Sequence, residues 1–308
     1  MYSHIPVMLP EVLEYLQPKK GEKIFDGTLG GANYSLAIAK AVGPEGQVFA
    51  TDLDLLAINN AKQRAEKEGI KNLTVINNNF GNLAEIAEKY GPFDGAVFDL
   101  GLSSAQLDDE ERGFSFQGDR PLSMSFNADN AEGEETENIL KYYNLLKLTE
   151  IFRVYGDEPK AYQAAKLIVE YRKKKTIKTT GDLLEALAPI MKGYHKINPA
   201  TKIFQALRIV TNKEYQNLEN ALSALAKALK PGARVVFVSF HSGEDRIIKN
   251  FFRQESRDCI CPPQAPICNC GHQATLKIIT KKPLAPSSLE SSTNPRARSS
   301  KLRAAIRI

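Results

Sequence analysis

Three short apolar runs in the first third of the chain each end on an aspartate, and helix-forming segments separate them. The runs end at Asp26, Asp52 and Asp99. Strands that alternate with helices predict right-handed βαβ units and a mostly parallel sheet. In such a sheet, ligands bind beyond the carboxyl ends of the strands, near the point where strand order reverses. Three carboxylates at that edge favour a cationic or polyhydroxylated ligand over a simple phosphate.

The alternation is broken once, in the middle of the chain. Strands are expected over residues 24–26, 47–52, 74–77, 96–99, 234–240, 276–280 and 300–307. Helices are expected over residues 11–20, 34–42, 55–68, 83–90, 218–229 and 244–254, and the Pro- and Ser-rich residues 283–295 are expected to cross the surface. Residues 136–212 show helical patterns without a strand. We therefore expect a discontinuous α/β domain, residues 1–102 and 213–308, with an inserted, mainly helical domain over residues 103–212.

Length and composition are those of a soluble globular protein. The 308 residues are 43% hydrophobic and 25% charged. No apolar run approaches the roughly 18 residues of a membrane span. The first residues lack the basic and apolar regions of a secretory signal. We therefore expect a cytoplasmic protein.

Basic residues are concentrated in two places. Residues 281–308 contain seven Lys or Arg residues and one acidic residue, Glu290. A second cluster comprises residues 172–175 and Lys178. Clustered positive charge is typical of a nucleic-acid partner. A solvated helix face and a basic tail would explain the same pattern equally well.

A turn rich in small residues follows the first expected strand. It reads Asp26-Gly27-Thr28-Leu29-Gly30-Gly31-Ala32 and opens a helix, so its backbone N–H groups can approach a ligand closely. An ordinary turn is the alternative, because this is not a full G-x-G-x-x-G fingerprint. Asp52 is placed to accept hydrogen bonds from both hydroxyls of a ribose, which NAD and S-adenosylmethionine (AdoMet) share. Carboxylates at Asp26 and Asp99 repel a pyrophosphate and attract a sulfonium, so AdoMet is favoured.

Asp99 ends the fourth expected strand, where amino-methyltransferases keep an acidic or amide side chain beside the target nitrogen. An aromatic amine is a poor nucleophile because its lone pair is delocalised into the ring. A carboxylate can accept hydrogen bonds from the NH2 group and stabilise the positive charge that arrives on nitrogen. The alternative is an aspartate that caps the following turn.

Two further segments are candidates for substrate contacts. Arg112, Phe114 and Phe116 could stack on or clamp a base drawn out of its helix, or they could seat their own loop. His241 and Ser242 end an apolar strand at the same sheet edge as the aspartates. A Ser-His-Asp hydrolase is disfavoured because the chain lacks a G-x-S-x-G elbow.

All four cysteines lie within twelve residues, as Cys259-Ile260-Cys261 and Cys268-Asn269-Cys270. In a cytoplasmic protein such thiols indicate a metal site or reduced loop thiols rather than disulfides. The C-x-C pairs differ from the common C-x2-C zinc spacing, so zinc is an open alternative and not the favoured one.

Taken together, these segments resemble the bacterial small-subunit rRNA (cytosine-N4)-methyltransferase family, called RsmH or MraW. The matching blocks run along nearly the whole chain and cover residues 4–11, 26–30, 99–108, 112–116, 198–209, 239–246 and 294–303.

This resemblance implies AdoMet-dependent methylation of N4 of a cytidine in the decoding region of 16S rRNA or of the small ribosomal subunit. It implies a class I methyltransferase fold, Rossmann-like, whose inserted helical domain helps to hold the RNA. Carried over by position, the cofactor contacts fall on Ala32, Asn33, Tyr34, Asp52, Phe80, Asp99 and Gln106, and we expect Gly30 of the turn to join them. Phe80 would pack on the adenine, and Asp99 would orient the target amine.

The chain departs from the family pattern at some of these contacts. Ala32-Asn33-Tyr34 stands where Gly-Gly-His is usual, and Ser123-Met124-Ser125-Phe126 replaces Asp-Met-Arg-Met. Two alternatives follow: a divergent paralogue that binds RNA or ribosomes with little activity, and an N-methyltransferase that acts on another nucleic acid or on protein.

Overall fold

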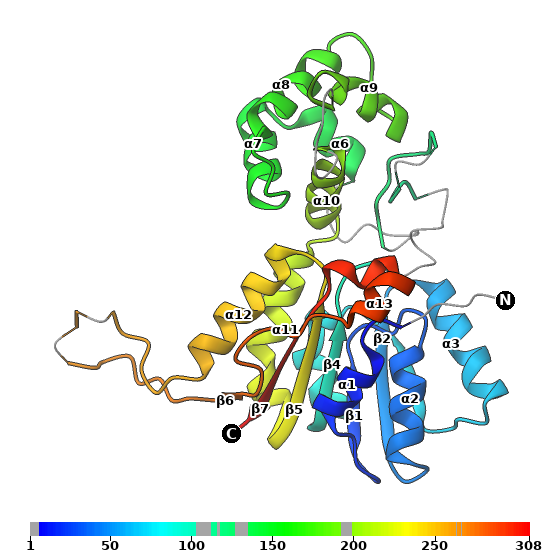
Figure 1. The fold of residues 1–308 in the computed structure, drawn as a ribbon, viewed down its shortest axis with the longest axis vertical. Coiled ribbons are helices and arrows are strands. Elements are labelled where there is room, and N and C mark those ends of the chain that lie inside the picture. The colour runs from blue at the N-terminus through cyan, green and yellow to red at the C-terminus, as the bar shows by residue number, and fades with distance from the viewer. Residues whose placement is uncertain are drawn as a thin grey trace. The chain divides into compact units, whose positions relative to one another are not determined.

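The computed structural model describes residues 6–102, 112–115, 118–126, 135–191, 199–262, 264–265 and 267–308. The chain divides into two compact units (Figure 1). The first, which we call the sheet unit, comprises Met1–Gly101 and Tyr215–Ile308. The second, the inserted unit, comprises Leu102–Glu214.

A seven-stranded sheet organises the described part of the sheet unit, in the order β3-β2-β1-β4-β5-β7-β6. Its strands are β1 Lys23–Asp26, β2 Gln47–Asp52, β3 Leu73–Asn77, β4 Phe93–Asp99, β5 Leu229–Ser239, β6 Leu276–Ile278 and β7 Lys301–Arg307. The pairings among β1 to β5 are parallel, and β7 runs antiparallel to both β5 and β6. This is the strand order of the class I methyltransferase fold, so the expected fold class is confirmed. Strand order reverses between β1 and β4, where open α/β sheets bind ligands.

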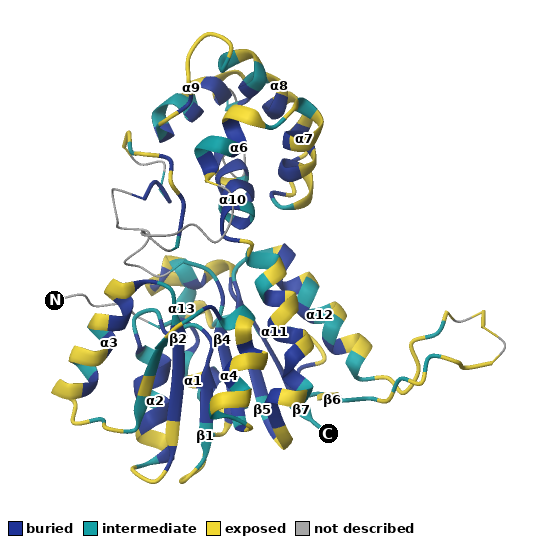
Figure 2. Cartoon of the chain, turned by 180° about the vertical axis from the view of Figure 1, so that it is seen from behind, coloured by how far each residue is buried: buried dark blue, intermediate teal, exposed yellow. Residues whose placement is uncertain are grey.

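Helices cover both faces of this sheet. They are α1 Leu9–Leu16, α2 Asn33–Val42, α3 Leu55–Lys67, α4 Leu83–Tyr90, α11 Glu214–Ala228 and α12 Ser242–Glu255. Residues of α4, α11 and α12 share one apolar cluster with the sheet, and residues of α1 and α2 share another. The helices alternate buried and exposed stripes accordingly (Figure 2).

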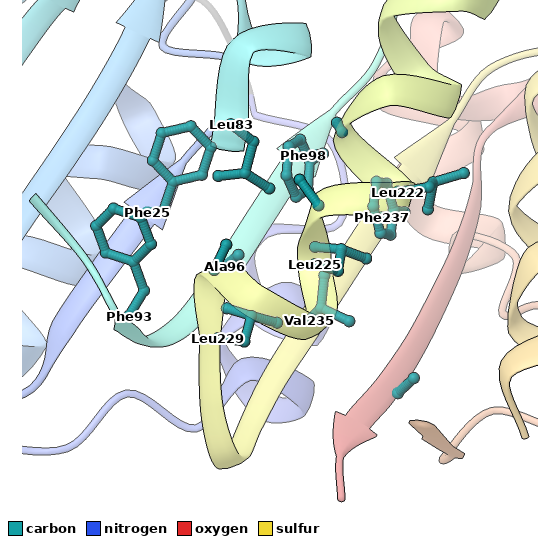
Figure 3. Close-up of a cluster of buried hydrophobic side chains, with 14 of the residues drawn as sticks. Phe25, Leu83, Phe93, Ala96, Phe98, Leu222, Leu225, Leu229, Val235 and Phe237 are labelled. Atoms are coloured by element: carbon teal, nitrogen blue, oxygen red, sulfur yellow. The ribbon is translucent and has the colours of Figure 1, made fainter. Parts of the chain in front are cut away.

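Successive residues of the strands enter opposite cores, because side chains alternate across a strand. On β4 and β5, Val97 and Val236 join the cluster of α1 and α2, whereas Phe98 and Phe237 join that of α4, α11 and α12. The rings of Phe98 and Phe237 stack with centroids 4.5 Å apart and planes 6° apart (Figure 3). These strands are buried on both faces, as in parallel sheets generally.

The inserted unit has a helical core of its own. Its described helices are α6 Thr136–Tyr142, α7 Leu145–Val154, α8 Ala161–Tyr171, α9 Thr180–Met191 and α10 Pro199–Thr211. Phe152, Leu187 and Leu207 are fully buried at its centre. None of the helices in the described ranges combines the length and apolar character needed to cross a bilayer.

Several elements differ from the sequence expectation at their ends, such as α1, which spans Leu9–Leu16 rather than residues 11–20, and two segments differ more deeply. β5 begins at Leu229 rather than Arg234, although Pro231 and Gly232 lie within it. Phe93 pairs with Leu229 and Gly95 with Arg234. Extra residues of β5 between these two pairs therefore form a bulge that interrupts the β4–β5 pairing. The segment expected to cross the surface instead contains a short helix, α13 Ser288–Thr293, and a 3-10 turn over Pro295–Ser299.

Part of the positive charge predicted for an RNA partner is used inside the fold. Arg303 on β7 is buried and donates to both carboxylate oxygens of Asp245, at 2.6 and 3.3 Å. Arg307 Nε donates to the carbonyl oxygen of Ala226 at 2.9 Å. A buried guanidinium paired in this way stabilises the fold and presents no charge to a ligand. In the inserted unit, Lys175 is exposed and pairs at the surface with acidic side chains of α9.

We predict that Phe237→Ala lowers the free energy of unfolding by about 3–5 kcal/mol, because it removes one ring of the stack and leaves a cavity between sheet and helices. Leu289→Ala on α13 is the control: its side chain is 72% exposed, and we expect a change within about 0.5 kcal/mol. Urea unfolding followed by circular dichroism measures both. Equal losses in the two variants would contradict the central place given to this stack.

Candidate active site

The carboxyl ends of β1, β2 and β4 bring the three strand-ending aspartates to one edge of the sheet. Asp26 is in register with Ala50 of β2 and Val97 of β4. Asp52 and Asp99 extend two residues beyond those partners. The spacing of apolar runs alone therefore predicted correctly that these carboxylates share an edge.

Asp26 is fully buried and supports the turn that follows it. Its Oδ1 accepts a hydrogen bond from the Thr28 backbone N–H at 3.0 Å, and its Oδ2 accepts one from the Ser35 hydroxyl at 2.6 Å. Burial raises the pKa of the Asp26 carboxyl against the lowering effect of these donors. Asp26 therefore acts on the turn and on the local field, because its side chain is fully buried and both of its oxygens hold the turn.

Asp52 holds the far side of the same turn. Its Oδ2 accepts from the Gly30 N–H and its Oδ1 from the Asp54 N–H, each at 2.9 Å. Burial raises the pKa of the Asp52 carboxyl to about 6, and this effect outweighs the lowering of the pKa by the backbone N–H donors. A carboxylate oxygen has two lone pairs, so each of these oxygens can accept one further hydrogen bond.

Among the carboxyl groups described at this edge, Asp99 has an incomplete set of hydrogen-bond donors. Its backbone N–H donates to Thr28 Oγ1 at 2.6 Å, which fixes the strand end. Its Oδ1 is buried, and no residue that the structure describes donates to it. Burial first, and then the negative charges of Asp26 and Glu244, raise the pKa of Asp99 well above its ordinary value. A buried acceptor without a donor indicates a position that a ligand donor can fill.

His241 and Glu244 form a capping box at the start of α12. Glu244 is buried, and its Oε2 accepts from the Phe240 N–H at 2.8 Å and the His241 N–H at 3.3 Å. His241 Nδ1 accepts from the Glu244 N–H at 3.4 Å. These contacts give His241 a structural role, and the neighbouring Ser242 is exposed at the first turn of the helix.

The turn expected to hold the cofactor is stabilised by contacts that its sequence does not reveal. Ala32 adopts a left-handed conformation with φ of 63° and is buried as the N-cap of α2. Asn33 Oδ1 accepts from Arg64 at 3.0 Å, and Arg64 also donates to the Gly31 carbonyl. The buried Tyr34 hydroxyl donates to the Val7 carbonyl. Tyr34 therefore ties the turn to the N-terminal segment through the group that would otherwise reach a ligand.

Phe80 lies just after β3, on the same side of the sheet as Phe98. The two rings meet edge to face, with centroids 5.9 Å apart. A Cβ at Gly27 would overlap the Phe98 ring and lie 3.2 Å from Phe80 Cβ. The absence of a side chain at Gly27 therefore lets the first strand end close to both rings.

The predicted substrate residues of the inserted unit are largely buried. Phe114 packs in the core of that unit with its ring 5.7 Å from that of Phe126, and Arg112 donates to the Phe126 carbonyl at 3.3 Å. Burial favours the reading in which these side chains seat their own loop. Phe116 and Gln106, also predicted as contacts, lie outside the described residues.

Sequence reasoning missed three residues that shape the edge: Thr28, Ser35 and Glu244. Glu244 could have been found, because it stands three residues after His241, the spacing of a capping box. Thr28 and Ser35 carry no such signal, since only the folded turn brings their hydroxyls to the two aspartates.

The edge as a whole is suited to a positively charged ligand that donates hydrogen bonds. Asp52 and Asp99 are its partly exposed carboxyl groups, and each has acceptor capacity left. Burial raises the pKa of both carboxyl groups and so disfavours their charged forms, which a bound cation would stabilise.

Comparison with known proteins places the chain in a family. Residues 1–308 match the MraW methylase family. A protein of Thermomicrobium roseum named ribosomal RNA small subunit methyltransferase H is 44% identical, over 99% of this chain and 94% of its own length. Proteins of the same name from Dehalococcoides mccartyi and Halothermothrix orenii are 43% and 42% identical, over 100% of this chain and 87% and 99% of their own lengths.

Among solved structures, that of a putative rRNA-methylase from Clostridium thermocellum has a TM-score of 0.48 and 13% sequence identity, covering 99% of this chain and 100% of that chain. That likeness is too distant to inform the site. The match along the whole sequence and the identity to its relatives show that this chain belongs to the MraW methylase family.

Proposed function

We propose that this protein transfers the methyl group of AdoMet to N4 of a cytidine in the decoding region of 16S rRNA. The observation that carries the proposal is Asp99, whose buried Oδ1 has no donor among the described residues, at the sheet edge where class I folds bind ligands. Relatives named ribosomal RNA small subunit methyltransferase H, at 42–44% identity, favour this substrate over others.

The residues at the edge fit AdoMet. Asp52 has acceptor capacity for both ribose hydroxyls while it holds Gly30 and Asp54. Phe80 follows β3 and is only partly buried, so its ring can pack on the adenine. Carboxylates attract the sulfonium and the amino group of the methionine end. The bound cofactor supplies an electrophilic methyl group, and the remaining chemistry falls to the protein.

Asp99 would orient the acceptor amine and take up its proton. As a carboxylate it accepts a hydrogen bond from N4, so that the nitrogen lone pair can point at the methyl carbon. The C–N bond forms as the C–S bond breaks, and positive charge moves from sulfur to nitrogen. The nitrogen then loses a proton, which can pass to Asp99 Oδ1. Burial, followed by the negative charges of Asp26 and Glu244, raises the pKa of this carboxyl group and favours its protonation.

The base must leave any helix before it can react, because pairing occupies N4. We assign the holding of the RNA to the inserted unit and to exposed basic residues outside internal ion pairs. Lys173 and Lys174 of that unit are exposed. Such contacts would be with phosphates and independent of sequence.

The experiment that tests the proposal is a map of N4-methylated cytidines in rRNA from cells with and without the gene. We expect one 16S cytidine to lose its N4-methyl group on deletion and to regain it on complementation. Calorimetric titration with AdoMet accompanies the map. Absence of AdoMet binding would favour the divergent RNA-binding paralogue, and binding without any change in rRNA would favour another acceptor.

We predict that Asp99→Asn lowers kcat by about 10²–10³-fold, the usual effect of removing one charge-stabilising group from a transition state. RNA affinity should change little, because phosphate contacts dominate it. Single-turnover methylation and filter binding measure the two quantities. The matched control is Asp94→Asn, the same chemical change near the opposite end of β4. A loss of RNA affinity as large as the loss of kcat would make Asp99 a structural residue.

We predict that AdoMet binding weakens as the pH falls through about 6. The folded-state pKa of Asp52 is about 6, so acid neutralises this acceptor, whereas above that pH the carboxylate is charged. The raised pKa also means that ionisation of Asp52 opposes folding of the ligand-free protein as pH rises, and bound AdoMet offsets that effect.

Titration calorimetry between pH 5 and pH 8 checks this dependence. In Asp52→Asn we expect weaker binding throughout and a shallower decline at low pH, because residue 52 no longer carries a titratable group. A pH profile identical to that of the unmodified protein would show that Asp52 does not contact the ligand.

A further inference from the structure

The segment between α12 and β6 has no apolar core of its own. Figure 1 shows it extending from the end of α12, and Figure 2 shows its described residues as exposed or partly exposed. No described residue between Ser256 and Thr275 is buried, and the side chains of Ile260 and Ile267 are 44% and 78% exposed. Hydrophobic burial therefore cannot account for the order of this segment.

The four cysteines nevertheless converge at one point within it. The Cys268 sulfur lies 3.4 Å from that of Cys259, 4.0 Å from that of Cys261 and 3.6 Å from that of Cys270. The sulfurs of Cys259 and Cys270 are 3.9 Å apart, and all four lie within 4.8 Å of one another.

These separations match a tetrahedral thiolate site. A Zn–S bond of about 2.3 Å gives a sulfur–sulfur edge of about 3.8 Å in a regular tetrahedron. Disulfide sulfurs would be about 2.0 Å apart, whereas the four thiols here are free. The Cys261 N–H also points at the Cys259 sulfur, at 3.4 Å. Such N–H donors orient metal-bound thiolates.

We propose that Cys259, Cys261, Cys268 and Cys270 bind one structural Zn²⁺. Each thiol loses its proton to solvent as the metal binds, and no electron is transferred. The metal joins the two C-x-C sequences into one unit. It thereby supplies stabilisation to a segment that has no apolar core of its own. Four protein ligands leave no open position, so the site is structural rather than catalytic.

The site is separate from the proposed methylation site. α12 joins the two: its N-terminus lies at the sheet edge beside Asp99, and its 14 residues span about 21 Å. Zinc binding and AdoMet binding should therefore be independent of each other. The proposal does not depend on the identity of the methylated substrate.

The test is metal analysis of the full-length protein, purified under reducing conditions without a metal-affinity column. We expect one zinc per chain by mass spectrometry. Exchange with Co²⁺ should give the intense visible bands of tetrahedral cobalt and thiolate-to-cobalt charge transfer. Limited proteolysis within residues 256–275 should accelerate after chelation.

Two variants sharpen this test. Cys268→Ser should lose stoichiometric zinc while thermal stabilisation by AdoMet persists, which shows that the sheet unit is folded. His272→Ala, two residues beyond Cys270, removes the nearest histidine in sequence and should retain zinc. Its imidazole lies outside the cluster of four sulfurs.

Several outcomes would overturn the proposal. They are failure of the reduced protein to take up Zn²⁺, iron in its place, retention of zinc by Cys268→Ser, and disulfides among these cysteines in freshly lysed cells. Loss of AdoMet binding on chelation would also overturn the structural role assigned to the metal.

Discussion

The concentration of carboxyl groups at one edge of the sheet is the constraint on which the candidate site depends. Burial raises the pKa of Asp99, and the nearby negative charges of Asp26 and Glu244 raise it further. Charges of one sign in a poorly solvated place are unfavourable unless donors or cations compensate them. Backbone N–H groups and hydroxyls compensate Asp26 and Glu244, whereas Asp99 Oδ1 has no donor among the described residues. This asymmetry makes the edge chemically suited to a cation that carries hydrogen-bond donors.

The rest of the sheet unit holds that edge in place. Phe98, one residue before Asp99, is stacked on Phe237 between β4, β5 and the helices. A rotation or slip of β4 would break the stack, so the position of Asp99 is linked to the packing of this apolar cluster. Glu244 fixes the start of α12 beside it through the capping box. The geometry needed for methyl transfer therefore depends on packing and on backbone hydrogen bonds.

Much of this arrangement could be predicted from local sequence. The apolar runs before Asp26, Asp52 and Asp99 were sufficient to predict parallel strands whose ends share an edge. The bounds of the helix over residues 83–90 and of the last strand were also predicted closely. The bulge in β5 could not be predicted from the sequence. Pro231 and Gly232 indicate the end of a helix or a turn, whereas the strand pairings on either side of them depend on β4, which is distant in sequence. Tyr34 was expected among the cofactor contacts, and no local pattern predicts that the Val7 carbonyl accepts a hydrogen bond from its hydroxyl.

The sequence by itself determined the fold class, the family and the residues that carry charge to the sheet edge, because periodicity and strand-end chemistry are local properties. Only the tertiary structure decided which of those groups are already engaged. Arg303, interpreted from the sequence as part of a basic tail, is buried against Asp245, and Asp99 keeps an acceptor to which no described residue donates. The cysteines show the same division: their spacing left metal and free thiols open, whereas sulfur separations of 3.4–4.0 Å favour one metal. Partnership between groups far apart in sequence is set by distance and burial, which exist only once the chain has folded.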